Sequence, residues 1–391
     1  MAVADARAEP ADGGLASIAP SRARLTALAI RDFRNLARID LAPPPDGFAL
    51  VGENGQGKTN LLEAIHYLQL LRSFRGARDV ELVRFDTDGF HVSAEIAHAA
   101  HRGVSVGFER ASKRKRVLVD GNIPPRLTDA LGAFPAVLFS PRDAETVAGA
   151  PGARRRFLDV MLALSSRPYL QALQRYRAAL AQRSAAMRQP GVSGARQEQS
   201  VAVWEAPLAE HGAILWRARR DWTVASGARY AELCAAIGER GTAAMHYASG
   251  LGEPGEPQAA LRDVLARNRS TDIRRGLTQA GPHRDDLVLT LGGRDLRAFG
   301  SAGQQRTAAI ALRLLESATR RAASGLEPVV LLDDPFAELD ARRAARILEL
   351  LGAEGSGQTV LAVPRADDIP EGLTRLARYH IAAGAVRAGT P

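Results

Sequence analysis

The segment from Gly52 to Thr59, GENGQGKT, constrains the fold of this 391-residue chain more than any other feature. It has the spacing G-x-x-x-x-G-K-[ST], follows the apolar run GFALV and opens a helical pattern of leucines, the context that a phosphate-binding loop requires. Glycines let successive backbone N–H groups surround phosphate oxygens, and the helix N-terminus adds partial positive charge. The predicted nucleotide contacts are Gly52, Glu53, Asn54, Gly55, Gln56, Gly57, Lys58, Thr59 and Asn60.

Within this loop, Lys58 is predicted to act in catalysis by reaching the β and γ phosphates of ATP, and Thr59 to bind Mg²⁺. Only three of the 52 basic residues are lysines, and one of them stands at the position that the motif demands. The chance that an ordinary glycine turn produces this match is therefore small.

A second pattern is the apolar strand VVLLDD, residues 329–334, which ends in two carboxylates. Phosphate-loop ATPases keep a Mg²⁺ ligand at the end of such a strand, and we assign that role to Asp333. Asp334 would then face the γ-phosphate and polarise the attacking water. An ordinary strand-to-turn junction is the alternative, since aspartate is common there.

A third pattern, SAGQQR at residues 301–306, predicts another helix N-terminus that could bind an anion. Ser301, Gly303 and Gln304 would grip the γ-phosphate bound to a second subunit, which makes the site composite. The alternative is that Ser301 only caps its own helix.

Strand and helix patterns predict an α/β fold whose head is split by an insert. Strands are expected at 24–33 and 47–52, then an antiparallel meander, a strand at 135–140, and strands again from 286 onward. Between 153 and 237 strand signals vanish, and a short coiled-coil-like seam (Val201, Leu208, Leu215, Trp222; Trp204, His211, Ala218, Ala225) predicts a helical hairpin. The predicted domains are a disordered tail (1–21), an N-terminal head half (22–150), an all-helical insert (151–270) and a C-terminal head half (271–391).

Charge suggests a polyanion partner. The formal net charge is +9, and residues 151–230 hold thirteen arginines against five acids. The runs 113–116 and 154–156 are candidate DNA contacts, with solvated or acid-paired helix faces as the alternative. The single cysteine, Cys234, excludes an intrachain disulfide, and apolar runs are too short for a membrane span, so a cytoplasmic protein is expected. The three tryptophans are expected in the core.

In this order, the three motifs resemble the head of ABC-type ATPases, specifically the SMC-like group and, within it, the RecF family of recombination mediator ATPases. The supporting phrases are FRN (33–35), LVGENGQGKTNLLEAIHYL (50–68), RS (72–73), VLFSPRD (137–143), RRRFLD (154–159), AGPHRDDL (280–287), FGSAGQQR (299–306) and LLDDPFAELD (331–340). The resemblance implies a weak, DNA-stimulated ATPase that dimerises on binding ATP and is located in the cytoplasm, near the nucleoid. It implies binding to gapped duplex or single-strand/double-strand junctions, and RecO- and RecR-like partners in recombinase loading.

By matched position, the resemblance places Arg34 and Asn35 near nucleotide, 301–304 as the signature motif, and 338–340 as the loop after the Mg²⁺-binding strand. Val363 and Pro364 stand where related ATPases often have Thr or His, so turnover is expected to be slow. A DNA-binding scaffold that barely hydrolyses ATP stays open for this reason. A transport ATPase subunit is a further alternative, against which the basic insert and the GPHRDD phrase argue. His283, Asp285 and Asp286 could hold a metal or, instead, join the two head halves by hydrogen bonds.

Overall fold

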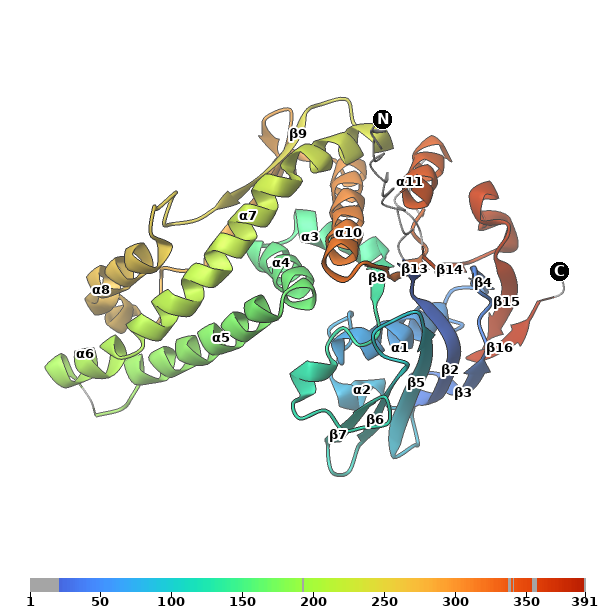
Figure 1. Cartoon of the computed structure of the whole chain (residues 1–391), viewed down its shortest axis with the longest axis horizontal. Helices are drawn as coiled ribbons and strands as arrows, with labels where there is room; N and C mark the ends of the chain where they lie inside the picture. The colour runs from blue at the N-terminus through green and yellow to red at the C-terminus, as the bar shows by residue number, and fades with distance from the viewer. Residues whose placement is uncertain (1–20, 192, 337–338, 340, 354–356, 390–391) are drawn as a thin grey trace, which may run out of the picture.

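The computed structural model describes residues 21–191, 193–336, 339, 341–353 and 357–389. Its head contains a six-stranded sheet in the order β16-β15-β4-β14-β13-β8, parallel except for the β15–β16 hairpin (Figure 1). The strands of this core sheet are β4 (Gly47–Val51), β8 (Ala136–Phe139), β13 (Val329–Asp333), β14 (Thr359–Val363), β15 (Ala377–Ala382) and β16 (Ala385–Ala388).

A second, antiparallel sheet has the order β3-β2-β5-β6-β7; the predicted meander forms its last three strands, and β2 and β3 extend it. We call this whole sheet the meander. Its strands are β2 (Arg24–Phe33), β3 (Leu36–Leu41), β5 (Gly89–Ala97), β6 (Gly103–Glu109) and β7 (Arg114–Val119). Helix α1 (Lys58–Leu70) packs between the two sheets, and ten of its 13 residues are buried. The helix that follows the phosphate loop is therefore fixed on several sides.

The inner strands of the core sheet are buried on both faces, which explains their continuous apolar sequences. Phe48 and Leu50 of β4 face α1 and the meander, whereas Ala49 and Val51 join the core formed with the helical part. This alternation of successive side chains makes the core sheet the wall between two cores.

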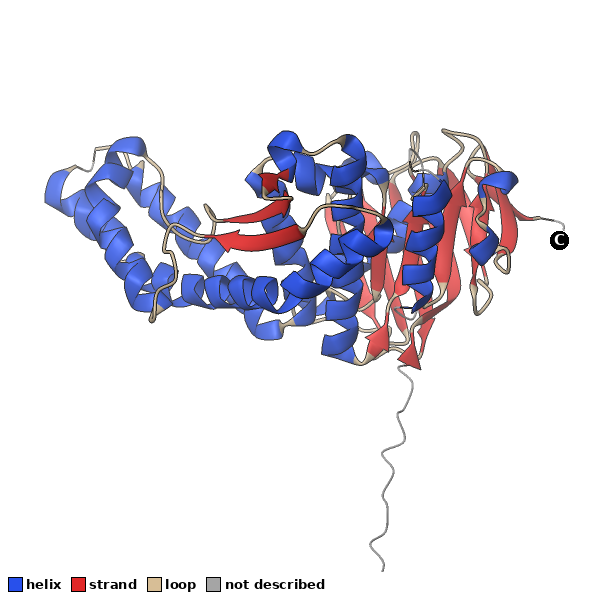
Figure 2. Ribbon diagram, turned by 90° about the horizontal axis from the view of Figure 1, so that it is seen from above, coloured by secondary structure: helices blue, strands red, loops and turns tan. Residues whose placement is uncertain are grey.

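The helical part forms an arm that projects from one side of the head, and the core sheet and the meander are gathered in the head (Figure 2). Helices α5 and α7 lie side by side along the arm and form the predicted hairpin. The elements of the arm are α4 (Pro151–Ser165), α5 (Arg167–Met187), α6 (Gly194–Ala202), α7 (Glu205–Ile237), β9 (Ala243–Ala248) and α8 (Pro257–Arg275).

Strand β9 corrects the prediction of an all-helical insert. Strand β9 lies inside the range 151–270. It pairs antiparallel with β10 (Asp286–Leu291) over six residues. Its sequence, AAMHYA, is short and contains no β-branched residue, so the sequence by itself gives little indication of a strand. The seam is only partly a single helix: Val201 belongs to α6, Ala225 is exposed, and Leu208, Leu215 and Trp222 are buried in α7.

The return to the head runs through α10 (Ala302–Ser324), β13 and α11 (Ala341–Ala353). Helix α10 begins at the predicted helix N-terminus, and β13 coincides with the predicted strand VVLLDD to within one residue. Strand β3 and the β15–β16 hairpin were not predicted. The remaining short elements are β1 (Ser21–Arg22), α2 (Asp79–Leu82), α3 (Ala144–Ala148), β11 (Arg294–Asp295), α9 (Leu296–Phe299) and β12 (Leu326–Glu327). None of the described helices is long and apolar enough to cross a membrane. The predicted tail lies outside the described residues, except for Ser21.

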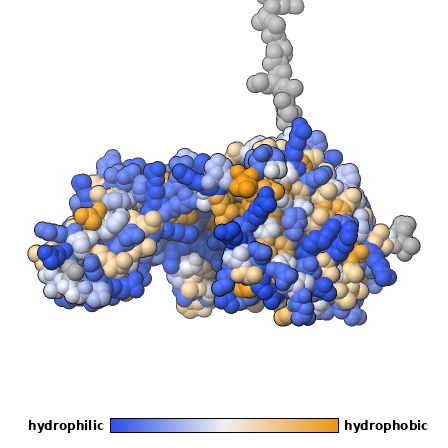
Figure 3. Space-filling view, turned by 90° about the horizontal axis from the view of Figure 1, so that it is seen from below, coloured by the Kyte–Doolittle hydropathy of each residue, from blue (hydrophilic) through white to orange (hydrophobic). Residues whose placement is uncertain are grey.

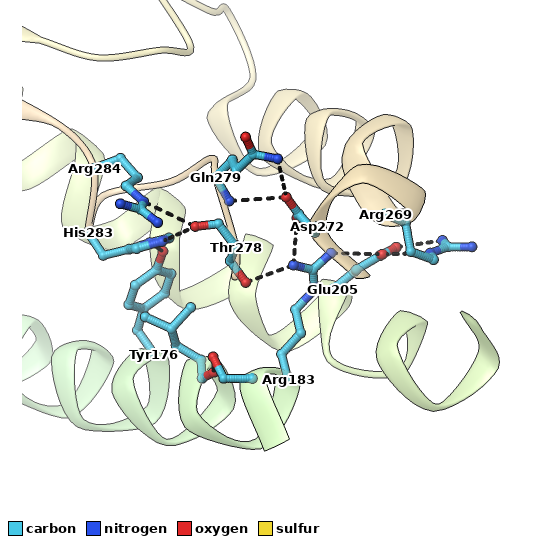
Figure 4. Close-up of polar contacts among 11 residues, drawn as sticks. Tyr176, Arg183, Glu205, Arg269, Asp272, Thr278, Gln279, His283 and Arg284 are labelled. Carbon is cyan, nitrogen blue, oxygen red and sulfur yellow. Dashed lines mark hydrogen bonds and ion pairs between the residues drawn. The ribbon is translucent and has the colours of Figure 1, made fainter. Parts of the chain in front are cut away.

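A buried polar cluster holds the far part of the arm together (Figure 4). Arg183 of α5 is fully buried and donates to Asp272 of α8 at 2.8 Å and to Thr278 at 2.7 Å. Arg269 of α8 forms a two-pronged ion pair with Glu205 of α7 at 2.7 and 2.8 Å. These contacts fasten three helices to the loop that leads into β10.

Candidate nucleotide site

The phosphate loop occupies residues 52–57, between β4 and α1. Gly57 has φ +118°, and a Cβ there would lie 2.9 Å from the Asn35 amide, so only glycine fits. The loop is also tied to the C-terminal hairpin, because the Gln56 carbonyl accepts from the Gly384 N–H at 2.9 Å and the Gln56 side chain from the Ala383 N–H at 2.7 Å. The loop conformation is therefore set by segments far apart in the sequence.

The Lys58 ammonium lies over this loop. It donates to the carbonyl oxygens of Gly52 and, at 3.0 Å, Glu53. Burial lowers the pKa of Lys58, while Asp334 and Asp333 act in the opposite direction. A cation held this way can exchange carbonyl partners for phosphate oxygens, as the motif predicts.

Thr59 and Asp333 meet as the sequence predicts, although 274 positions separate them. The Thr59 hydroxyl donates to Asp333 Oδ1 at 2.9 Å. Two neighbouring ligands of an octahedral Mg²⁺ at 2.0–2.1 Å are about 2.9 Å apart, so this oxygen pair fits Mg²⁺. Burial, with a smaller effect from Asp334, raises the pKa of Asp333, and a bound cation would offset that cost.

Asp334 follows directly, with φ +44°, a strained conformation for a non-glycine residue. Its N–H donates to the Ala362 carbonyl at 3.0 Å, which fixes the turn against β14. Burial raises the pKa of Asp334, and Lys58 and Arg306 oppose this shift. Arg306, from the SAGQQR motif, also donates to the carbonyls of Asp334 (3.4 Å) and Pro335 (3.1 Å).

The two N-terminal candidates have different surroundings. Asn35 donates to the Gln56 carbonyl at 3.1 Å and accepts from Asn60 at 2.8 Å, so it supports the phosphate loop directly. Arg34 instead forms a two-pronged ion pair with Glu63 of α1, at 3.0 and 3.1 Å. Its predicted contact with nucleotide stays a prediction.

Ser301 caps α10: its hydroxyl accepts from the Gln304 N–H at 3.3 Å, and Gln304 accepts from the Ser301 N–H at 2.9 Å. The capping alternative is thus realised, and a role at a second subunit's nucleotide stays a prediction. In the loop after the Mg²⁺-binding strand, Glu338 and Asp340 lie outside the described residues.

His283, Asp285 and Asp286 form hydrogen bonds, as the second alternative predicts, but their partners Arg154, Tyr176 and Tyr247 belong to the arm, so these contacts do not join the two head halves directly. Asp286 forms a two-pronged pair with Arg154 at 2.8 Å, and Asp285 accepts from Tyr247 at 2.6 Å. The Thr278 carbonyl can only accept, so His283 Nε2 carries its proton (3.0 Å) and Nδ1 accepts from the Tyr176 hydroxyl (2.7 Å) (Figure 4). Within the described ranges, no cluster of three His, Cys, Asp or Glu could hold a metal ion.

We expect His283 to make the protein sensitive to acid. Burial, with Arg284 and Arg155 nearby, lowers the pKa of His283 to about 4 from an ordinary value of about 6.5. The unfolded chain then binds the proton first, so stability falls as the pH drops from about 6.5 toward 4, by about 2 kcal/mol at pH 5. Urea unfolding at pH 7 and pH 5 should show this loss in the wild type and a smaller loss in His283→Gln. Equal losses in both proteins would contradict the assignment.

Several other candidates prove structural. Lys115 pairs with Asp79 at 2.8 Å, and Arg154 is buried against Asp286. Trp216 and Trp222 are buried, as predicted, whereas Trp204 is only partly buried; Cys234 is also buried. The basic runs 113–116 and 154–156 are therefore partly acid-paired or buried.

This geometry, a phosphate loop and a strand-end carboxylate pair in a head divided by a helical arm, defines an ABC-type ATPase head of the SMC class. A model of the "RecF/RecN/SMC N terminal domain" matches residues 24–369. The Smc head domain from Pyrococcus furiosus has a TM-score of 0.55 over 94% of this chain and 96% of its own, at 16% identity, which supports the fold alone.

Within that class, the chain belongs to the RecF family. A "DNA replication and repair protein RecF" of Anaeromyxobacter dehalogenans is 38% identical over 343 residues, 84% of this chain and 90% of the relative. The protein of the same name from Frankia alni is 37% identical over 377 residues, 93% and 98%. The solved "recombination mediator protein RecF-ATP in RecFOR pathway" has a TM-score of 0.85 at 29% identity, covering 96% of this chain and all of that one.

Proposed function

We propose that this protein is an ATP-gated DNA-binding ATPase of replication and recombinational repair. Thr59 and Asp333 would hold Mg²⁺, Lys58 the phosphates, and Ser301, Gly303 and Gln304 of a second copy would close over the γ-phosphate. The 2.9 Å contact between Thr59 and Asp333 carries the proposal, because it joins the phosphate loop to the end of β13. The relatives' names and the ATP complex of a RecF protein support it.

In this scheme hydrolysis is slow and resets the dimer. Asp334 would polarise the attacking water, and the nearby cations Lys58 and Arg306 favour its charged form. Val363 is buried and apolar, and Pro364 has no N–H to donate, so neither supplies a polar group at the usual Thr or His position. We therefore keep as a second candidate a DNA-binding scaffold that binds ATP and barely hydrolyses it.

The DNA surface that we propose is a cleft lined by residues of the head and the arm. Figure 3 shows a hollow between these two parts of the molecule with hydrophilic residues around it. The cleft has a volume of about 530 Å³. Its basic lining consists of Arg72, just after α1, and of Arg155, Arg156, Arg177 and Arg219 of the arm, whereas most of the remaining lining is apolar and includes Leu131, Leu164 and Leu180. Its one acid, Asp159, already pairs with Arg177 (2.8 Å) and Arg219 (2.6 Å).

The charge surplus of the arm is less telling than this cleft. At least eight of the thirteen arginines in 151–230 form ion pairs with acids. Among the described residues, however, Arg72 and Arg156 have no ion-pair partner. Burial lowers the pKa of Arg72, and so does repulsion from Arg156 and Arg177, which a phosphate backbone would relieve.

We expect Arg72→Gln/Arg156→Gln to weaken binding to gapped duplex about tenfold or more and to reduce the salt dependence by about two charges. Fluorescence anisotropy at several salt concentrations, with ATP, measures both. The matched control is Arg175→Gln/Arg196→Gln, which removes the same charge from exposed positions of the arm outside the cleft. An equal loss in the control would show that only total charge matters.

Light scattering with and without ATP and Mg²⁺, repeated with gapped duplex, tests the whole proposal. We expect an ATP-dependent shift from monomer to dimer that DNA strengthens. A monomer under every condition would overturn the gated dimer and favour the scaffold. RecO- and RecR-like partners and a place in the cytoplasm, near the nucleoid, belong to the same proposal and rest on family membership alone.

A further inference from the structure

The end of α7 and the starts of α10 and α11 lie close together, and the side chain of Arg343 in α11 contacts the other two. We call residues 301–307, at the start of α10, the signature turn, and α10 the signature helix. Arg343 lies near the start of α11, and its Nη1 is 2.9 Å from Glu239 Oε1, just after the end of α7. The same nitrogen is 3.0 Å from Thr307 Oγ1 and 3.5 Å from the Gly303 carbonyl of α10. One guanidinium thus joins the arm, the signature helix and the helix that follows the Mg²⁺-binding strand.

Glu239 is held firmly to the end of α7. Its N–H donates to the Cys234 carbonyl at 3.0 Å, and its side chain is only 6% exposed. Gly238 before it has φ +132°, and a Cβ there would lie 2.9 Å from Arg346 of α11, so the two helices approach closely. Helix α7 has 33 residues, about 50 Å, and runs from the outer arm to the head (Figure 1). The Glu239 carboxylate must therefore move with the arm.

On the other side, the first turns of α10 carry the signature residues. Thr307 is fully buried, whereas Ser301 at the helix start is exposed. Arg306, next to Thr307, holds the carbonyls of Asp334 and Pro335. The start of α10 is therefore linked to the arm through Arg343. It is linked through Arg306 to the turn at Asp334 and Pro335, which follows the Mg²⁺-binding strand.

We infer that Arg343 is a positioning residue that couples the arm to the signature turn, so that DNA held by the arm changes how readily ATP joins two copies of the chain. This inference rests on the proposed function, and it names the contacts through which DNA binding would affect ATP-dependent dimerisation. Arg343 acts through Glu239, Thr307 and Gly303. If the arm moves relative to the head, the Glu239 carboxylate moves with it and displaces the Arg343 guanidinium. Because Arg343 also contacts Gly303 and Thr307, α10 shifts as well.

The test measures the ATP concentration that gives half-maximal dimerisation, by light scattering, with and without gapped duplex. The ratio of the two concentrations is the DNA effect, and couplings of this kind are typically about fivefold or more. We expect Arg343→Gln and Glu239→Gln each to bring the ratio close to one, and the double variant to add nothing further, because both remove the same contact. Arg343→Lys, which keeps the charge, should retain part of the effect.

The matched control is Arg342→Gln, the same change at the exposed neighbouring position of α11, which should keep the wild-type ratio. A purely structural role would lower the unfolding temperature and leave the ratio unchanged, and that result would overturn the inference. Glu239→Gln has nearly the shape of the wild-type residue, so it serves if Arg343→Gln fails to fold. A wild type that never dimerises with ATP would overturn the proposed function and the inference with it, whereas dimerising variants with an unchanged ratio overturn the inference alone.

Discussion

Lys58→Met is expected to abolish ATP-dependent dimerisation while leaving the fold intact. Methionine has a similar length but cannot donate to phosphate oxygens, and losing charged hydrogen bonds of this kind costs about 3 kcal/mol, roughly a hundredfold in ATP affinity. The unliganded protein loses little, because the ammonium contacts only two loop carbonyls and burial already disfavours its charge. Calorimetric titration with ATP and Mg²⁺ measures the affinity, and thermal unfolding checks the fold.

Lys113→Met is the control for this experiment, since it makes the same change at an exposed turn between β6 and β7. It should bind ATP and dimerise like the wild type. If Lys58→Met dimerised normally with ATP and held gapped DNA as tightly as the wild type, the nucleotide-gated scheme would be wrong.

Ser301→Arg should separate nucleotide binding from dimerisation. The variant is expected to bind ATP with wild-type affinity, because the phosphate loop belongs to another part of the fold, yet to stay monomeric at saturating ATP. A long cation at the exposed start of α10 would block the approach of a second copy. Titration calorimetry and light scattering on the same sample distinguish the two steps.

Two further variants separate this contact from helix capping. Ser301→Ala removes the hydroxyl that accepts from the Gln304 N–H, at a cost of about 1 kcal/mol, without adding bulk. Ser324→Arg makes the bulky change at the exposed last residue of the same helix and should dimerise normally. Dimerisation of Ser301→Arg at wild-type ATP concentrations would leave Ser301 as a cap alone.

The local motifs made the core of the site predictable, and long-range packing hid the rest. Two short, contiguous sequence patterns, the phosphate loop and the apolar strand that ends in carboxylates, are sufficient to predict the positions of Lys58, Thr59 and Asp333. The ion pair of Arg34 with Glu63 and the cleft arginine Arg72 depend on contacts between distant segments, which no periodicity reveals.

The missed strands have the same physical origin. Strand β9 is stabilised by its partner β10, which lies some 40 residues later, rather than by its own propensity. Strand β15 likewise pairs with β4, although more than 300 positions separate them. The excess of arginine in residues 151–230 likewise overstates the charge available to a polyanion. Which guanidinium groups pair with acids depends on the fold and cannot be deduced from the sequence.

The C-terminal hairpin imposes an order on biosynthesis. Strand β4, which leads into the phosphate loop, pairs on both sides with strands made from residue 359 onward, and Gln56 is held by residues 383 and 384. At roughly 5–20 residues per second, more than about 15 s pass on the ribosome between synthesis of the loop and of the segments that shape it. The nascent chain therefore cannot complete its nucleotide pocket before residues 359–384 have been synthesised, so a shorter nascent chain is not expected to respond to ATP.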